Sequence, residues 1–202
     1  MSRYFYHGIA IPDMLQVLQT GGLKCKRLLG QEEHGFNGLD YISVCKKYAE
    51  EDYQNTDMNN AFYSCVQGNF CFIVSERVDA IKTHSSGQIK WYDYSDSLLT
   101  DKRNRISDMF DEWQAYQEIP LSMIIGVGIP SNYVDAILKK SSSTGRFIME
   151  LKEIVAVVTA LGLDIVDTNV LGFVEEYEKY KENSSSKVYQ ISKKLEEVIT
   201  HE

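Results

Sequence analysis

Apolar residues recur with a period of two in several short segments of the chain. Residues 3–9 alternate between two sets of side chains, which is the pattern of a short strand. Pro12-Asp13 then opens a helix and Gly21-Gly22 ends it, because glycine commonly follows a helix C-terminus. Further strands are predicted at residues 39–44, 70–74, 89–94, 112–116 and 123–129. This order of strands and helices predicts the α+β class.

Polar stretches separate these elements. Loops are expected at residues 30–38, 54–60 and 98–105, and a turn at 82–88. One short helix is expected from Lys47 to about Tyr53. The loop of residues 30–37, or that of 97–107, is a candidate lid over a binding site.

The C-terminal third of the chain has a helical period. Apolar stripes lie within residues 150–161, 173–180 and 188–198, and Gly162 stops the first of them. The stretch Ser141–Gly145 is the best candidate linker. We therefore expect one domain at residues 1–140 and a helical C-terminal extension at residues 141–202 packed on it.

The composition is that of an ordinary soluble globular chain. Its 202 residues are 44 % hydrophobic and 25 % charged, which is enough for one sizeable core. No apolar run approaches the roughly 18 residues of a membrane helix. The first residues lack the pattern of a signal peptide. These features predict a cytoplasmic protein without membrane contact.

Charge and cysteine content narrow the range of partners. A net charge of −8 argues against non-specific binding to a nucleic-acid backbone, although a local basic groove is compatible with it. Lys46 and Lys47 belong to a group of cations that could meet a phosphate-bearing ligand.

The four cysteines form no Cys-x-x-Cys pair, and the four histidines show no metal-ligand spacing. Reduced, mostly buried thiols and no metal are therefore expected.

Three short segments, far apart in the chain, combine aromatic with polar side chains. They are Tyr6-His7-Gly8, Gly38-Leu39-Asp40-Tyr41-Ile42-Ser43 and Asp111-Glu112-Trp113-Gln114-Ala115-Tyr116. Taken singly, each has an ordinary explanation: Glu112 as a solvated residue at a strand start, His7 as a core histidine bonded to a backbone carbonyl, and Tyr41 as a packing residue. The three segments are informative about function only in combination and in this order along the chain.

In that order, the segments resemble the ADP-ribosyltransferase superfamily, in its diphtheria-toxin and poly-ADP-ribose-polymerase branch. Tyr6-His7-Gly8 is similar to the His-Gly-Thr/Ser opening of that branch, and residues 15–23 are similar to the helix-and-glycine segment that follows it. Residues 38–43 resemble its Gly-Ile-Tyr-Phe strand, and residues 111–116 its Asn-Glu-Tyr-x-x-Tyr strand with the catalytic Glu. The resemblance covers roughly residues 4–129 and extends to bacterial toxin-like transferases, including the DNA-modifying DarT group.

The chain departs from the family pattern at three places. Ile9 stands where that branch has Thr or Ser, so a hydroxyl is missing. The second aromatic position falls between Tyr48 and Tyr53 in spacing. Phe110 stands two residues before Glu112, which argues against the branch with a Glu-x-Glu signature that modifies arginine or asparagine.

The resemblance implies a split, twisted β-sheet with flanking helices, and mono-ADP-ribosyl transfer with NAD as co-substrate. Cleavage of the bond between ribose and nicotinamide passes through an oxocarbenium-like cation, as in glycoside hydrolysis. Nicotinamide departs neutral, so the leaving group needs little acid help. The protein must supply a fixed negative group, orientation and exclusion of water, and one carboxylate is sufficient for this.

The resemblance assigns catalytic roles to Glu112, His7 and Tyr41. Glu112 would bind the ribose 2′-hydroxyl, stabilise the cation and draw off an acceptor proton. The NAD-binding residues implied are His7, Gly8, Arg27, Tyr41, Ser43 and Tyr48.

Each NAD-binding residue is expected to contact a different part of the dinucleotide. Gly8 would let the ligand approach the backbone closely. The rings of Tyr41 and Tyr48 would flank the nicotinamide, and Ser43 would bind its carboxamide. Arg27 would pair with the pyrophosphate.

Several alternatives remain open at this level. An NAD glycohydrolase on the same fold would use water as acceptor. A tRNA 2′-phosphotransferase would need an array of His and Arg that the sequence does not show. A degenerate transferase would bind an inhibitory or other partner through its C-terminal helices, with stripes at Tyr177/Tyr180 and Ile191/Leu195. For a transferase, the acidity of the chain favours a protein or small-molecule acceptor over nucleic acid.

Overall fold

The computed structural model describes residues 4–25, 28–29, 41–47, 60–82, 84–85, 88–89, 112–139, 145–171 and 191–200. Its strands are β1 (Phe5–Gly8), β2 (Gly22–Leu23), β3 (Ile42–Cys45), β4 (Cys71–Val74), β5 (Ile81–Lys82), β6 (His84–Ser85), β7 (Gln88–Ile89), β8 (Glu112–Ala115), β9 (Ile119–Pro120), β10 (Ile124–Ile129) and β11 (Asp164–Asp167). Its helices are α1 (Ile11–Thr20), α2 (Asn60–Cys65), α4 (Ser131–Leu138), α5 (Gly145–Ala160), α6 (Thr168–Leu171) and α8 (Ile191–Thr200), with a 3₁₀ turn η2 (Leu121–Met123).

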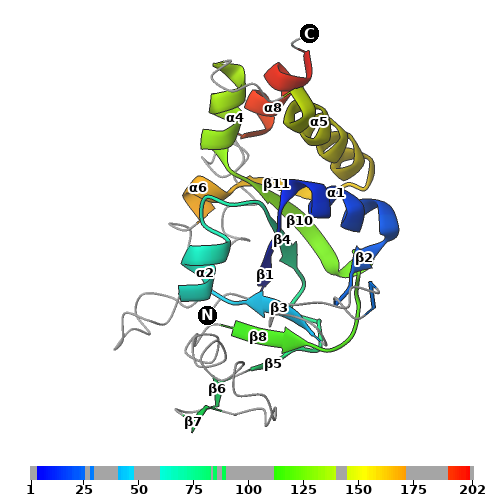
Figure 1. Ribbon diagram of the computed structural model, residues 1–202, viewed down its shortest axis with the longest axis vertical. Helices are drawn as coiled ribbons and strands as arrows, with labels where there is room; N and C mark the ends of the chain where they lie inside the picture. Colours follow the sequence, from blue (N-terminus) through cyan, green and yellow to red (C-terminus); the bar gives the residue numbers. More distant parts are fainter. Residues whose placement is uncertain are drawn as a thin grey trace.

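A seven-stranded sheet forms the centre of the described structure. Its strand order is β11-β10-β4-β1-β3-β8-β5 (Figure 1). The pairings are antiparallel except for β10 with β11, which run parallel. Two further two-stranded sheets join β2 to β9 and β6 to β7. The predicted mixture of a twisted sheet with flanking helices in the α+β class is confirmed.

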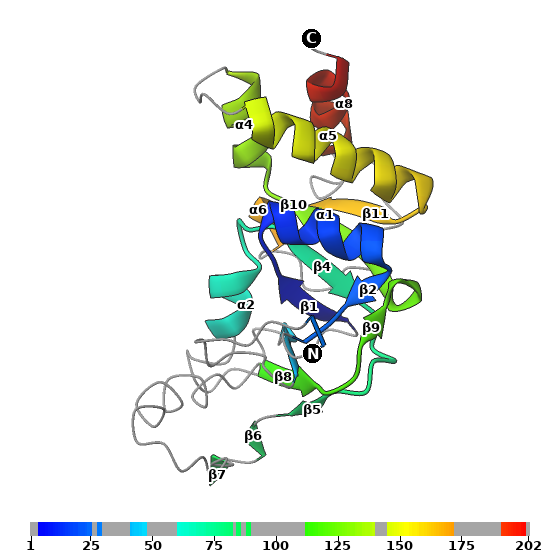
Figure 2. The same ribbon diagram turned by 45° about the vertical axis from the view of Figure 1, so that its right-hand side comes forward.

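Helices cover the sheet from both sides, and side chains alternate between the two faces along β1. Phe5 belongs to the larger apolar core with α1 and α5, whereas Tyr6 belongs to a smaller core with α2. Figure 2 shows α1 lying across one face beneath α5, with α2 apart from them. The faces are called below the α1 face and the α2 face.

Helices α4, α5 and α8 gather at the end of the sheet formed by β10 and β11, which we call the helical end (Figure 1). The apolar side chains of α8 are buried in the same core as Phe5; they are Ile191, Leu195 and Val198. The stripe Ile191/Leu195 is therefore part of the core packing. Strand β11 lies in the main sheet, so part of the segment expected to be a helical extension is a sheet strand.

Helix boundaries agree with the glycine signals. Gly21 follows α1 with a left-handed φ of 96°, and Gly162 follows α5 with a φ of 68°. Both predicted stops are confirmed. Helix α5 begins at Gly145, five residues earlier than the predicted helical stripe and at the last residue of the predicted linker. Helices α2 and α4 and strand β11 were not predicted.

Some predicted features lie outside the described residues. The candidate lids at 30–37 and 97–107 and the stripe at 173–180 lie wholly outside them. Most of the short helix expected after Lys47 and most of the strand expected at 89–94 also lie outside them. The segment expected to be a turn, 82–88, contains β6 and residues of β5 and β7. None of the helices in the described ranges has the length and apolar character needed to cross a bilayer.

Candidate active site

The register between β1 and β3 ends before the end of β1, and this place is called the opening below. The two strands are paired in register at Tyr6 and Cys45. The Ile9 amide donates to the Phe70 carbonyl at 2.9 Å. Because peptide groups alternate in direction along a strand, the odd-numbered residues of β1 direct theirs to β4 and the even-numbered residues direct theirs to β3. Gly8 would therefore face Ser43 in a continued ladder, but the recorded register ends two residues before that point.

His7 bridges this opening. Its Nδ1 lies 2.7 Å from the backbone carbonyl oxygen of Ser43. Because a carbonyl only accepts hydrogen bonds, Nδ1 carries the proton and Nε2 keeps its lone pair in the neutral ring. Burial lowers the pKa of His7 below its usual 6.5, and the bond to Ser43 offsets this only in part. The neutral imidazole is therefore favoured near pH 7.

Glu112 meets Ser43 from the next strand. The Ser43 hydroxyl donates to Glu112 Oε1 at 2.6 Å, a short bond of the kind made to an ionised carboxylate. Strands β3 and β8 are in register with Cys45 opposite Glu112. Glu112 is only 4 % exposed, so it is not the solvated residue that a Glu at a strand start usually is.

Glu112 and Ser43 belong to a row of polar and aromatic side chains on the α2 face. Ile42, Val44 and Ala115 point to the α1 face, which leaves the alternate positions of β3 and β8 on the other side. We call these residues the β3–β8 polar patch: Tyr41, Ser43, Glu112, Gln114 and Tyr116.

Two further contacts tie this patch together. Tyr116 donates its hydroxyl to Gln114 Oε1 at 2.7 Å, and its ring centroid lies 5.9 Å from that of Tyr41. Gln114 is 5 % exposed and stands directly opposite Ser43 in the ladder. The patch therefore holds two buried polar side chains, a costly arrangement unless their hydrogen bonds are satisfied.

Two of the three expected catalytic residues contact Ser43, and they leave their strands on opposite faces of the sheet. Glu112 contacts the Ser43 hydroxyl and His7 contacts the Ser43 carbonyl. Tyr41 precedes Ser43 by two residues. By strand alternation His7 leaves the backbone on the α1 face, and its ring reaches the carbonyl in the plane of the sheet.

The expected role of Gly8 needs a correction. A Cβ at Gly8 would come within 2.2 Å of the Cys65 backbone oxygen, so the end of α2 fills the space that the missing side chain leaves. The glycine is required by the approach of this helix, and no ligand can use that space. The peptide groups of Gly8 still point toward β3, as described above. Arg27 and Tyr48 lie outside the described residues.

The two lysines after β3 point to opposite faces of the sheet. Lys46 Nζ lies 4.4 Å from the ring centroid of Phe5 and 5.1 Å from that of Trp113, on the α1 face. Burial lowers the pKa of Lys46, and Glu76 offsets part of that effect. Lys47 Nζ lies 5.7 Å from the ring centroid of Phe62, on the α2 face. Of the two, only Lys47 shares a face with Glu112.

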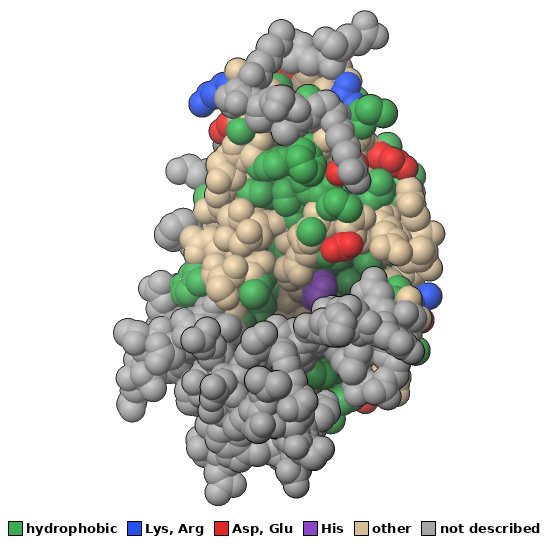
Figure 3. All heavy atoms as spheres, viewed as in Figure 1, with side chains coloured by type: hydrophobic (Ala, Val, Ile, Leu, Met, Phe, Trp, Pro, Cys, Tyr) green, Lys and Arg blue, Asp and Glu red, His purple; other side chains and the backbone are tan. Residues whose placement is uncertain are grey.

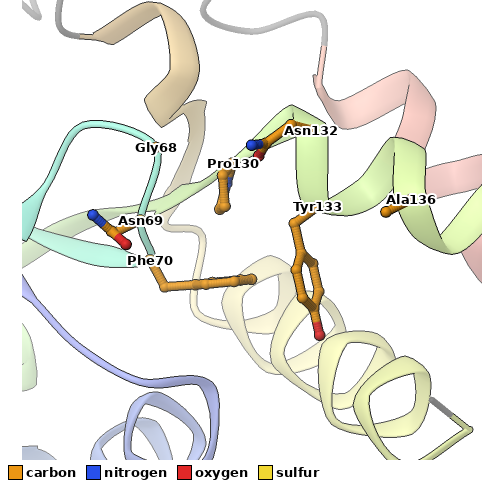
Figure 4. Close-up of a pocket in the computed structure, with 7 residues that line it drawn as sticks. All are labelled: Gly68, Asn69, Phe70, Pro130, Asn132, Tyr133 and Ala136. Carbon is orange, nitrogen blue, oxygen red and sulfur yellow. The ribbon is translucent and has the colours of Figure 1, made fainter. Parts of the chain in front are cut away.

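A pocket of about 370 Å³ lies elsewhere, between the loop before β4 and the start of α4 (Figure 4). It is lined by Gly68, Asn69, Phe70, Pro130, Asn132, Tyr133 and Ala136. None of these is a carboxylate or a cation, and none belongs to the polar patch. Figure 4 shows the Tyr133 hydroxyl pointing away from Asn69 and Asn132. The pocket therefore offers no charged side chain for stabilising a cation, although the rings of Phe70 and Tyr133 line it.

Other features of the described residues add little chemistry. In the view of Figure 3, Lys and Arg side chains appear at the margins of the coloured surface and form no basic patch there. Within the described ranges no cluster of three or more His, Cys, Asp or Glu is placed to hold a metal. The four cysteines form no disulfide with one another, and Cys25, Cys45 and Cys71 are buried, as expected for most of them. Burial raises the pKa of Cys71 to about 12.

Comparison with protein-family models, with curated proteins and with solved structures finds no match to this chain. The site is therefore defined by its own geometry. Sequence reasoning missed Gln114 and Tyr116 as members of the polar patch. The signal that would have found them is period two: both residues alternate with apolar positions in phase with Glu112.

Proposed function

We propose that the protein is a mono-ADP-ribosyltransferase that cleaves the nicotinamide–ribose bond of NAD and transfers ADP-ribose to an acceptor. The observation that carries the proposal is the buried Glu112 carboxylate held by the Ser43 hydroxyl at 2.6 Å, beside a sheet opening that His7 spans. The ordered resemblance of the His, Tyr and Glu segments to that superfamily supports it.

Glu112 would act where positive charge develops. As the C1′–N bond breaks, its electron pair leaves with nicotinamide and the ribose becomes cationic. A carboxylate held in a buried site stabilises that cation more strongly than it would in water. The hydrogen bond from Ser43 restricts the carboxylate to one orientation, so little reorganisation is needed during the reaction.

His7 and Gly8 would hold the substrate at the opening. The neutral His7 ring has its Nδ1 proton committed to Ser43, which leaves Nε2 as an acceptor suited to a ribose hydroxyl. The Gly8 peptide offers one N–H and one C=O toward β3, and a carboxamide such as that of nicotinamide pairs with both kinds of group.

The acceptor completes the transfer. Its nucleophilic lone pair would form the new bond to C1′, and its proton would pass to Glu112 or to solvent. A protein or a small molecule is the favoured acceptor for this acidic chain of net charge −8. If water takes this place, the product is free ADP-ribose and the protein is an NAD glycohydrolase.

Release of nicotinamide from NAD by the purified protein, alone and with cell lysate, tests the proposal. The wild-type protein should release nicotinamide, and labelled ADP-ribose should become attached to a component of the lysate. Free ADP-ribose as the sole product would replace the transferase with the hydrolase. The absence of both nicotinamide release and NAD binding would contradict the proposal.

The matched pair Glu112→Gln and Glu153→Gln locates the activity. Glu153 accepts a hydrogen bond from Gln19 between α1 and α5, away from the polar patch. The first substitution should abolish most of the nicotinamide release, and the second should leave it at the wild-type rate.

A further inference from the structure

The polar patch contains a second buried polar side chain besides Glu112. Gln114 lies two residues along β8 on the same face, which places its Cα about 6.7 Å from that of Glu112. It also stands opposite Ser43, whose hydroxyl holds Glu112. Any group bound against Ser43 and Glu112 is therefore close to the amide of Gln114.

Tyr116 fixes the orientation of this amide. The tyrosine hydroxyl donates to Gln114 Oε1 at 2.7 Å, so the oxygen end of the amide is turned toward Tyr116 and the nitrogen end away from it. Tyr116 is itself located by its ring contact with Tyr41. A buried amide oriented in this way has a defined donor direction, which a merely space-filling residue would not need.

We propose that Gln114 is a substrate-binding residue for the vicinal diol of a ribose. This inference rests on the proposed function: with the 2′-hydroxyl of the nicotinamide ribose at Glu112, the Gln114 amide holds the adjacent 3′-hydroxyl. An uncharged amide adds a hydrogen bond there without placing a second carboxylate beside Glu112. Tyr116 acts as a positioning residue through Gln114.

Binding of NAD analogues tests the pairing of residue and hydroxyl. The probes are NAD and its analogues that lack the 2′- or the 3′-hydroxyl of the nicotinamide ribose, and the readout is the dissociation constant. Wild-type protein should bind the 3′-deoxy analogue about 3- to 10-fold more weakly than NAD, the range expected for one hydrogen bond. Gln114→Ala should bind NAD and the 3′-deoxy analogue equally, while it still discriminates against the 2′-deoxy analogue.

Three further variants separate binding from structural support. Tyr116→Phe should reduce the discrimination against the 3′-deoxy analogue without removing it. Gln114→Glu keeps the size of the side chain and adds a second carboxylate, so the acid limb of kcat/KM should move to higher pH as Glu112 becomes harder to ionise. Gln117→Ala, an exposed glutamine three residues after Gln114, should behave as wild type.

The outcomes distinguish this inference from the proposed function. If Gln114→Ala, or Gln114→Met should the alanine variant not fold, keeps the full wild-type discrimination against the 3′-deoxy analogue, Gln114 does not bind that hydroxyl. The transferase proposal then stands without it. If the wild-type protein binds neither NAD nor the analogues, both proposals are wrong.

Discussion

The helical end is built mainly from apolar side chains, and its buried Asp167 carboxylate is paired with the backbone amides of Ser131 and Asn169, whereas the β3–β8 polar patch is built from polar and aromatic ones. At the helical end, Leu151, Ile154 and Val158 of α5 are fully buried, and polar contacts such as the one between Lys194 and Asp135 lie at the surface. In the patch, the buried side chains include a carboxylate and an amide. Apolar burial stabilises a fold, whereas burial of polar groups costs stability unless they are paired. The difference suggests that one region maintains the fold and the other serves chemistry.

Removal of the C-terminal helices should have the largest effect on the fold. Truncation after residue 168 takes away α8, whose Ile191 and Leu195 are 1 % and 2 % exposed in the main core. Each large apolar core side chain contributes about 2–5 kcal/mol when truncated to alanine, so the loss exceeds the usual margin of stability. We expect no cooperative thermal unfolding in the truncated protein.

The control for this truncation is Lys194→Ala. It breaks the 2.7 Å ion pair with Asp135, in which both side chains are 39 % exposed. Such pairs contribute about 0–1 kcal/mol, so the melting temperature should barely change. A truncated chain that unfolds cooperatively and binds NAD would show that α8 is a dispensable cap.

Glu112→Gln should separate the role of the polar patch from that of the helical end, because it should remove activity and leave the stability of the fold unchanged. The substitution keeps the shape of the side chain and removes its charge. Loss of one preorganised electrostatic group typically costs about 10²–10³-fold in turnover. Nicotinamide release by the variant should fall by that factor, with a melting temperature close to wild type. Equal activity of the two proteins would remove Glu112 from the mechanism.

Ser43→Ala should have a smaller effect on turnover than Glu112→Gln and a larger effect on stability. It removes the hydroxyl that donates to Glu112 Oε1 at 2.6 Å. A hydrogen bond to a charged group contributes about 1.5–3 kcal/mol, so we expect roughly a tenfold loss of turnover and a measurable drop in the free energy of unfolding. The control is Ser64→Ala, whose exposed hydroxyl makes a long 3.4 Å bond to Ala61. If the two variants behave alike, the Ser43–Glu112 bond has no special role.

His7→Gln should weaken NAD binding, because it removes the Nε2 acceptor, and it should also change the pH dependence of stability by a small amount. Burial lowers the folded-state pKa of His7 below 6.5, so the unfolded chain binds more protons in the window just below that pH. This contribution to stability is fully present above pH 6.5 and decreases as the pH falls through the window. In denaturant titrations from pH 7.5 to 5, the free energy of unfolding should therefore fall more steeply with decreasing pH for wild type than for the variant. Parallel curves would mean that His7 is not desolvated in the folded protein.

The strands and helices with a clear period were predictable from the sequence, but those held by distant residues were not. β1, α1, β4, β8 and β10 follow from local alternation or helical spacing together with glycine signals. Helix α4 was missed because its N-cap is Pro130, which supplies no capping side chain. Its first two amides donate instead to Asp167 and Asn169, which lie 36 and 37 residues further along the chain. No local pattern contains that information.

The candidate site likewise has features that follow from the local sequence and features that depend on distant residues. His7, Ser43 and Glu112 could be singled out by residue type and order, whereas the burial of Glu112 and its bond to Ser43 depend on the register of β3 with β8. Gly8 was singled out from the sequence, but the reason given for the glycine was wrong. The space beside it is filled by the backbone of Cys65, and such a tertiary contact has no local signal in the sequence. Gln114 and Tyr116 gain their roles only through cross-strand neighbours.

The measurement that tests the central claim most directly is an NMR titration of the isotopically labelled 23.1 kDa protein with NAD. Backbone amide signals of residues 6–8, 43–45 and 112–116 should shift in a saturable manner, while those of α4 and α8 stay in place. Shifts confined to the pocket around Phe70 and Tyr133, or no shifts at millimolar NAD, would contradict the assignment of the polar patch as the NAD site.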